Sequence, residues 1–210
     1  KQSRAQLQTE AQEGPQAVLQ RIFAAIREAM LGVDPEEVLG IGSGAPGPID
    51  QSGRLYDPPN LPGWKRISLT GPIFDQFQIP TFAGNDANLA ALGEVRFGAG
   101  QGLDHLIFMT VGTGIGGGVI SGGKLLLGAR GFAAEVGHQT LEPDGPICSC
   151  GQPGHLEALA SGPAIARRTR ERLEAGAVSS IAEYAEGGRE ITAKSVTDAA
   201  HHGDKLALEL

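Results

Sequence analysis

The chain is poor in cysteine, methionine and aromatic residues. Among its 210 residues are only two cysteines, two methionines and one tryptophan, and aromatic residues make up 5%. No run of about 18 apolar residues is present, so the sequence offers no membrane span. No signal peptide is visible, and reduced cysteines are typical of the cytoplasm, where we expect this protein to reside.

Positive charge is also sparse. Lys and Arg number 17 against 24 Asp and Glu, which gives a formal net charge of −7 without a basic cluster. This balance argues against a nucleic-acid partner for these residues. Glycine, in contrast, is abundant at 32 residues, which indicates tight turns and sites lined by backbone. The chain is long enough to bury a substantial core as one large domain or two small lobes.

The ends of the sequence lack the signs of a complete chain. It starts KQSRAQLQTEA without an initiating Met and stops at KLALEL within a helical pattern. We therefore expect it to be part of a longer protein.

Hydrophobic spacing predicts helices and strands along the whole sequence. Apolar residues at helical spacing predict helices over 15–31, 71–78, 85–98, 156–161, 163–173 and 192–201. Strands are predicted over 38–43 and 80–83, and 105–128 is interpreted as strand, glycine turn, strand, turn and strand. A loop with three prolines and the only Trp covers 57–64.

The segment Gly137–Glu157 holds both cysteines. Cys148 and Cys150 are bracketed by His138 and His155. Two thiolates and two imidazoles are the donors of a closed tetrahedral zinc site. The spacer is rich in Gly and Pro and has little apolar content to order itself, so we expect a structural zinc ion that fixes the loop.

A catalytic zinc is disfavoured here, because four protein ligands leave no open position for water. Two alternatives remain for the thiols. Cys148 and Cys150 are either ordinary loop thiols or form a strained disulfide across one residue, since Cys-x-Cys is a weaker zinc signal than Cys-x-x-Cys.

Five glycines lie within residues 112–118. The G-x-G-x-x-G pattern there invites a dinucleotide-binding interpretation, but that fingerprint needs a helix directly after the glycines. VISGGKLLLG follows instead, so the turn joins two strands. A P-loop match at 118–124 fails as well, because Leu125 stands where Ser or Thr should hold magnesium.

A glycine-rich turn can still cradle phosphate through its own backbone N–H groups. The alternative is a plain tight hairpin, although five glycines exceed what a two-residue turn needs. The residues proposed to bind the nucleotide are Gly112, Thr113, Gly114 and Gly116.

Asn85 and Asp86 lie at a predicted strand-to-helix junction. A carboxylate at this place, beside a turn that cradles phosphate, can accept the proton of an attacking hydroxyl in phosphoryl transfer. The alternative is that Asp86 is only a helix cap, although Asn88 could serve that role instead. Asn60, Glu135, His138 and Glu157 would complete a polar pocket suited to a sugar, because carboxylates and amides each take two hydroxyl groups.

Six segments together resemble the ROK family (repressors, open reading frames and sugar kinases), most closely its bacterial glucokinase branch. They are GIGSGAPGPID, PNLPGW, AGNDANLAALGE, MTVGTGIGGGVI, EVGH and CSCGQPGHLE. The resemblance implies an α/β, actin-like (ribonuclease H-like) two-lobed sugar kinase fold with a zinc-stapled loop over 138–155. The N-terminal lobe would cover 1–84 and the C-terminal lobe 85–210. The family's first phosphate loop, Asp-x-Gly-Gly-Thr-Lys, and its C-terminal closing segment are missing from these residues.

The resemblance also implies an activity, the ATP-dependent phosphorylation of a hexose, with glucose preferred. Asp86 would be the general base for the sugar 6-hydroxyl, and ATP with Mg²⁺ the co-substrate. A homodimer or homotetramer is expected. The residues expected to bind the sugar are Asn60, Asn85, Asp86, Glu135, His138 and Glu157, and the ligands of structural Zn²⁺ are His138, Cys148, Cys150 and His155. The chain departs from the family at His155, where a third Cys is usual.

Two other functions fit the same residues. One keeps the chemistry and changes the sugar to N-acetylmannosamine, mannose or fructose. The other is the sugar-sensing domain of a ROK transcriptional repressor, whose DNA-binding helices would precede Lys1. The presence of both Asp86 and the glycine turn favours an enzyme.

Overall fold

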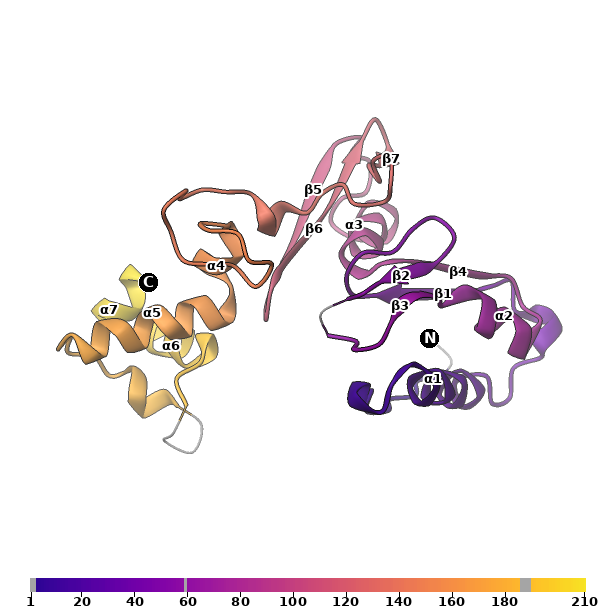
Figure 1. Ribbon diagram of the computed structural model, residues 1–210, viewed down its shortest axis with the longest axis horizontal. Helices are drawn as coiled ribbons and strands as arrows, with labels where there is room; N and C mark the ends of the chain where they lie inside the picture. The colour runs from indigo at the N-terminus through magenta and orange to yellow at the C-terminus, as the bar shows by residue number, and fades with distance from the viewer. Residues whose placement is uncertain (1–2, 59, 186–189) are drawn as a thin grey trace. The chain divides into compact units, whose positions relative to one another are not determined.

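The computed structural model describes residues 3–58, 60–185 and 190–210. The chain forms two compact units, one made of the residues up to 106 with 118–133, the other of 107–117 with 134–210. Figure 1 follows the course of the chain. The boundary that we predict at residues 84 and 85 concerns the lobes of a longer protein and stays a prediction.

Parallel strands lie at the centre of the first unit. β1 (Ile41–Ala45) pairs with β4 (Thr81–Asn85) in the register Ile41↔Thr81 to Ala45↔Asn85. β2 (Arg54–Tyr56) and β3 (Lys65–Ser68) form an antiparallel pair. The helices of this unit are α1 (Pro15–Ala29), α2 (Thr70–Phe77) and α3 (Asp86–Phe97), with short 3₁₀ turns η1 (Ala11–Glu13) and η2 (Pro35–Glu37).

One apolar core supports this unit. The face of α1 that carries Val18, Leu19 and Phe23 is buried, and Leu55 and Ile73 in the same core are fully buried. Burial of each such side chain contributes about 1.5–3 kcal/mol relative to leaving it in water. The C-terminal end of β4, at Asn85, therefore lies beside this apolar core.

A three-stranded sheet has the order β5 (Leu106–Val111), β6 (Ile115–Ser121) and β7 (Lys124–Leu125). The remaining elements belong to the second unit. They are η3 (Val136–His138), α4 (Leu156–Ala160), α5 (Gly162–Glu174), η4 (Ile181–Tyr184), α6 (Ala193–His201) and α7 (Lys205–Glu209). A small core around Ile181, Val196 and Ala199 holds η4, α6 and α7 together.

The predicted elements are present, with shifted ends. The glycine turn joins two strands, β5 and β6, as expected, and Thr192 caps α6 through its side chain. The strand predicted over 38–43 lies at 41–45 instead. The sequence does not indicate this position clearly, because Gly42 and Gly44 have low β propensity. The β2–β3 pair was missed, since its three- and four-residue strands around the 57–64 loop are too short to show alternation. Pro59 of that loop lies outside the described residues.

In the described part of the chain, every helix is too short or too polar to cross a membrane.

Candidate active site and metal centre

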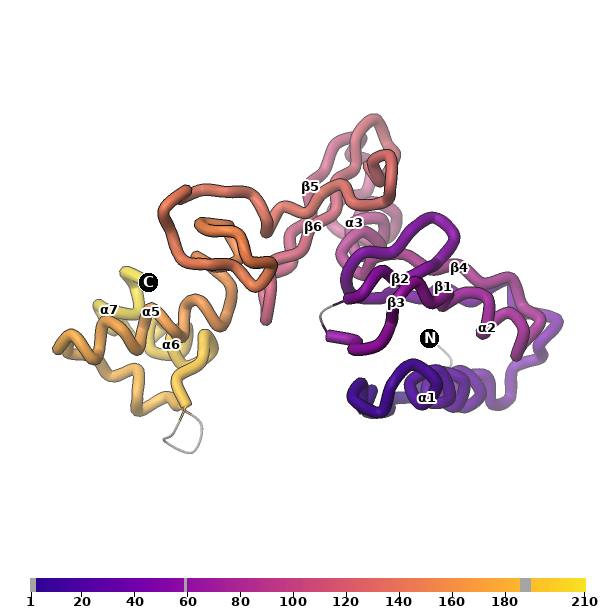
Figure 2. Tube along the Cα trace, viewed as in Figure 1, coloured from indigo at the N-terminus to yellow at the C-terminus, as the bar shows by residue number. Residues whose placement is uncertain are grey.

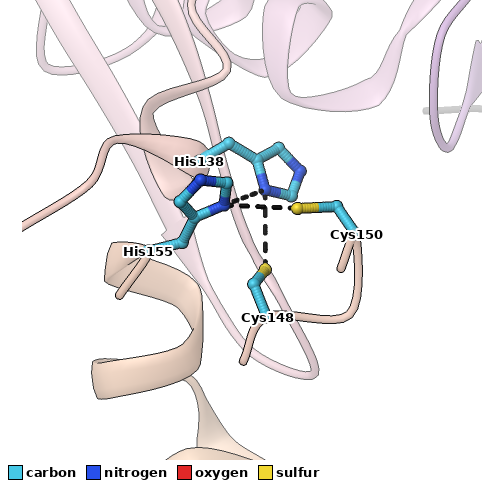
Figure 3. Close-up of side chains that lie close together, drawn as sticks. All are labelled: His138, Cys148, Cys150 and His155. Carbon is cyan, nitrogen blue, oxygen red and sulfur yellow. Dashed lines mark hydrogen bonds between the residues drawn. The ribbon is translucent and has the colours of Figure 1, made fainter. Parts of the chain in front are cut away.

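The four predicted metal ligands come together in the second unit. Figure 3 shows the side chains of His138, Cys148, Cys150 and His155 turned toward one another, and their ligand atoms all lie within 4.8 Å of one another. The Nδ1 atoms of the two imidazoles are 3.3 Å apart. Cys148 Sγ lies 3.7 Å from His138 Nδ1, and Cys150 Sγ lies 3.3 Å from His155 Nδ1.

These separations fit a tetrahedral zinc site. Zn–N bonds of about 2.0–2.1 Å and Zn–S bonds of about 2.3 Å give tetrahedral N–N edges of about 3.4 Å and N–S edges of about 3.6 Å. The observed edges of 3.3, 3.3 and 3.7 Å are close to both values. A Cys₂His₂ donor set is one that structural zinc accepts. The residues present therefore fit the ion.

The loop that carries the cysteines is also held by its own backbone. It doubles back before α4 (Figure 2), with isolated bridges Ile147↔Pro153 and Thr140↔His155. Cys148 N–H donates to the Gln152 carbonyl and Gly151 N–H to the Cys148 carbonyl, both at 2.8 Å. The main-chain groups of this loop therefore pair with one another, in addition to the contacts among its candidate metal ligands.

Glycine at position 154 is required in this loop. Its φ is +66°, and a Cβ there would overlap the Glu142 carbonyl. Gly154 N–H donates to the Pro146 carbonyl while its own carbonyl accepts from Leu141. The close approach places His155 directly at the start of α4.

Both cysteines are free thiols, so the strained disulfide is not adopted. Cys148 is buried and Cys150 is exposed. Burial raises the pKa of the Cys148 thiol above its usual value. Bound zinc reverses this preference, because the ion takes thiolate as its ligand.

Glu157 lies in the first turn of α4, two residues after the ligand His155. Its Oε2 accepts from the Ile115 N–H at 3.0 Å, and its Oε1 accepts from the Ser149 hydroxyl at 2.8 Å and from the Cys148 thiol at 3.6 Å. Burial opposes ionisation, but the bonds from Ile115 and Ser149, with the charge of His138, lower its pKa overall. The group is an anion at neutral pH.

The glycine turn also lines a pocket in the second unit. A pocket of about 580 Å³ is lined by Gly112 and Thr113, by the first residues of α5 and α6, and by Arg170 and Lys194. Gly162 N–H donates to the Gly112 carbonyl at 2.8 Å, which ties the turn to the start of α5. Glu190 lines the pocket as well, but the two helix N-termini and the two basic side chains outnumber it and favour an anion there.

The other two residues of the predicted nucleotide set lie elsewhere. Gly114 is in contact with Glu157, and Gly116 is within β6 rather than in the lining of the pocket. Sequence reasoning missed Arg170 and Lys194, because they belong to helices that the periodicity predicts without any motif that marks a ligand.

Asn85 and Asp86 form the junction of β4 and α3. The Asn85 side chain accepts from the Asn88 N–H at 3.0 Å, so Asn85 is the cap of α3. The suggestion that Asn88 caps the helix is wrong, because Asn88 is three residues further on and buried within it. Asp86 is exposed, and its Oδ1 accepts from the adjacent Ala87 N–H at 2.8 Å. The helix does not need Asp86 as its cap.

The remaining predicted sugar residues lie in both units. Asn60 is exposed and lines a cavity of about 570 Å³ in the first unit, together with Arg21 and Trp64. Glu135 precedes η3 in the second unit, and its carbonyl accepts from the His138 N–H at 3.0 Å. Glu135, His138 and Glu157 thus belong to the second unit, whereas Asn60, Asn85 and Asp86 belong to the first unit.

Comparison with known proteins agrees with these features. The ROK family model matches residues 1–210. A glucokinase of Thermotoga maritima is 42% identical over 201 residues, which cover 95% of this chain and 62% of that protein. The chain thus spans less than two thirds of this relative's length.

Solved structures give the same result. A ROK family glucokinase from Streptomyces griseus, in complex with glucose and AMPPNP, has a TM-score of 0.77 and 38% identity over 93% of this chain and 63% of its own. A ROK family transcriptional regulator, a homologue of the E. coli MLC protein, has a TM-score of 0.81 and 30% identity over 92% of this chain and 48% of its own. The fold is that of the actin-like ROK sugar kinases. The chain therefore belongs to the ROK family.

Proposed function

We propose that the protein containing this chain phosphorylates glucose with ATP, with Asp86 as the general base. The exposed carboxylate of Asp86 carries this proposal, because Asn85 already caps α3, and the Asp86 side chain, which accepts from the adjacent Ala87 N–H, is not needed as the cap. The attacking 6-hydroxyl is weakly acidic, and a positioned carboxylate can take its proton as the bond to phosphorus forms. The T. maritima and S. griseus glucokinases support the choice of sugar and reaction.

The pocket beside the glycine turn supports the use of a nucleotide. Gly112 and Thr113 present backbone there, while α5 and α6 both begin at its wall. Positive helix ends, with Arg170 and Lys194, suit the phosphates of ATP. The S. griseus relative was solved with AMPPNP, an ATP analogue. We propose that Mg²⁺ accompanies ATP, since a divalent ion neutralises the charge that develops in phosphoryl transfer.

The sugar is proposed to bind through amides, carboxylates and one imidazole. His138 directs Nδ1 at the metal cluster, which leaves its Nε2 for a hydroxyl group. Glu157 accepts from Ile115 and Ser149, and also from the Cys148 thiol when no zinc is bound, and a carboxylate has about four acceptor positions, so capacity for a sugar hydroxyl remains. The proposed set is Asn60, Asn85, Asp86, Glu135, His138 and Glu157.

We propose structural Zn²⁺ for the Cys₂His₂ cluster. His138, Cys148, Cys150 and His155 would hold the ion, and its chemistry there is to fix thiolates and imidazoles in one arrangement. The use of His155 in place of the family's usual third Cys keeps four ligands and makes the site less negative. Free thiols fit the cytoplasmic location that we propose for the whole protein. We also propose that it forms a homodimer or homotetramer.

A sugar-sensing role is the second candidate, because a ROK transcriptional regulator has a TM-score of 0.81 to this chain. In that case the sugar would bind without turnover. Another hexose remains the third candidate, since an N-acetylmannosamine kinase of Shigella boydii is 36% identical over 94% of the chain.

Steady-state kinetics of the full-length protein would separate the candidates. ATP-dependent turnover is measured with glucose, mannose, fructose and N-acetylmannosamine, together with equilibrium binding of each sugar. We expect glucose to have the highest kcat/KM. Tight sugar binding without any turnover would instead identify the sensor, and a higher kcat/KM for another hexose would replace glucose as the substrate.

A further inference from the structure

The carboxylate of Glu157 contacts two segments that are far apart in the sequence. Its Oε2 accepts a hydrogen bond from the Ile115 N–H, at the end of the glycine turn. Its Oε1 accepts from the hydroxyl of Ser149, the residue between the two cysteines. One side chain thus joins the metal-binding loop to the glycine turn, and all of these residues belong to the second unit.

The glycine turn is shaped to admit this carboxylate. A Cβ on Gly114 would lie 2.5 Å from Glu157 Oε2, a distance that real Cβ atoms essentially never show. Gly114 is absent from the residues with positive φ, so its backbone conformation alone does not require glycine. A side chain at position 114 would therefore displace the Glu157 carboxylate from its place at the turn.

Both anchors of Glu157 are themselves held. Ile115 is buried and begins strand β6. Ser149 lies in a turn closed by the Gly151 N–H, which donates to the Cys148 carbonyl at 2.8 Å. Hydrogen bonds to an ionised carboxylate are short and about twice as strong as neutral ones. With one oxygen held from each side, the Glu157 carboxylate has a single orientation.

We propose that Glu157 couples the order of the metal-binding loop to the glycine turn, and that Ser149 is the positioning residue on which this coupling depends. When the loop is ordered, Ser149 holds Oε1 and thereby keeps Oε2 on the Ile115 N–H. When the loop loosens, that backbone bond weakens. The consequence for nucleotide affinity rests on the function proposed above, whereas the coupling itself does not.

Such coupling is reciprocal. If order in the loop raises the affinity of the glycine turn for phosphate, phosphate bound at the turn raises the order of the loop by the same free energy. Ser149 then contributes to nucleotide binding from a segment that contains two metal ligands.

Hydrogen exchange of the backbone amides over 112–117 tests the coupling in the full-length, zinc-loaded protein. Ser149→Ala removes the hydroxyl, and Ser149→Thr keeps it as the matched control. We expect exchange in Ser149→Ala to be about 2- to 30-fold faster, the range for mutations along a coupled network. Ser149→Thr should exchange like wild type, and zinc removal by a chelator should accelerate the same amides. Zinc content and circular dichroism confirm that both variants fold.

Unchanged exchange over 112–117 in Ser149→Ala, with zinc retained, would overturn the coupling. The affinity for a non-hydrolysable ATP analogue is measured on the same samples. A loss in Ser149→Ala that is restored in Ser149→Thr supports the coupling and the nucleotide function together. Faster exchange in a protein that binds no nucleotide would support the coupling and refute the proposed kinase activity.

Discussion

At the β4–α3 junction, regular secondary structure places the residues proposed for catalysis. β4 pairs with β1 along its whole length, α3 begins directly after it, and the Asn85 side chain caps the helix. The loop around Cys148 has no such frame, because its order depends on isolated bridges, backbone bonds and side-chain contacts to sulfur and carboxylate. We therefore expect the junction to tolerate chemical substitution without moving, and the metal loop to change shape when one group is lost.

The two regions also differ in how much buried apolar surface stabilises them. The junction lies beside the apolar core that includes Ile73 and Leu55, so the burial of apolar surface stabilises it. In the loop, Leu141 and Ile147 are exposed at 57% and 67%, so apolar burial contributes little there. Removal of the metal should therefore disorder the loop before it affects the junction.

The largest effect is expected from removal of the thiols. Cys148→Ala with Cys150→Ala leaves two imidazoles, too few for a closed zinc site, so zinc should fall from about one per chain to none. Elemental analysis measures the zinc, and limited proteolysis should show cleavage within 137–157 while the junction stays protected. A fully folded wild-type protein in which elemental analysis finds no metal would contradict the zinc assignment.

Asp86→Asn tests the chemistry of the junction separately from its shape. Asn keeps the size of the side chain but cannot accept a proton, so kcat should fall by at least about a hundredfold in the full-length protein. Melting temperature, zinc content and sugar affinity should stay near wild type, because Asn85 and not Asp86 caps α3. Near-normal kcat would move the interpretation to a sugar sensor.

Glu157→Gln is expected to raise the KM for the sugar more than it lowers kcat. The amide keeps one acceptor oxygen and loses the charge, and a hydrogen bond to a charged group contributes about 1.5–3 kcal/mol, or roughly ten- to a hundredfold. Steady-state kinetics with several hexoses measures the split. If KM stayed constant for every sugar, Glu157 would serve only to join Ser149 and Ile115.

The cap of α3 gives a smaller effect, on stability. Asn85→Ala removes the acceptor for the Asn88 N–H and should cost about 1 kcal/mol of unfolding free energy. Asn85→Asp is the control, since Asp caps as well as Asn. Urea denaturation measures both. Equal stability of all three proteins would mean that the packing of α3 outweighs its cap.

The smallest effect concerns a turn in the first unit that needs no metal. Hydrogen bonds from Ser52, together with those from Tyr56 and Arg54, lower the pKa of Asp50 to about 2. A depressed folded-state pKa stabilises the protein above the unfolded value of about 3.9, and this contribution is lost as the pH falls toward 2. The stability difference between wild type and Asp50→Asn should therefore shrink between pH 5 and pH 2. A constant difference would show that the charge of Asp50 does not matter.

Much of the site was visible in the sequence because its signals are local. The four candidate metal ligands lie within eighteen residues, counting from His138 to His155, and their donor chemistry alone predicts the ion that they fit. The glycine turn was assigned correctly between two strands, since the residues that follow it are β-branched and not helical. Periodicity also placed α1, α3 and α6.

The sequence by itself thus determined the metal-binding loop, the order of the elements and the position of Asp86 at the start of a helix. Only the tertiary structure decided which asparagine caps α3 and that Glu157 lies between Ser149 and Ile115. These contacts join residues whose spacing carries no period, and they depend on side-chain orientation. The sequence does not show whether a carboxylate binds a sugar, a backbone amide or a serine hydroxyl. The fold selects among these partners by bringing them within hydrogen-bond distance.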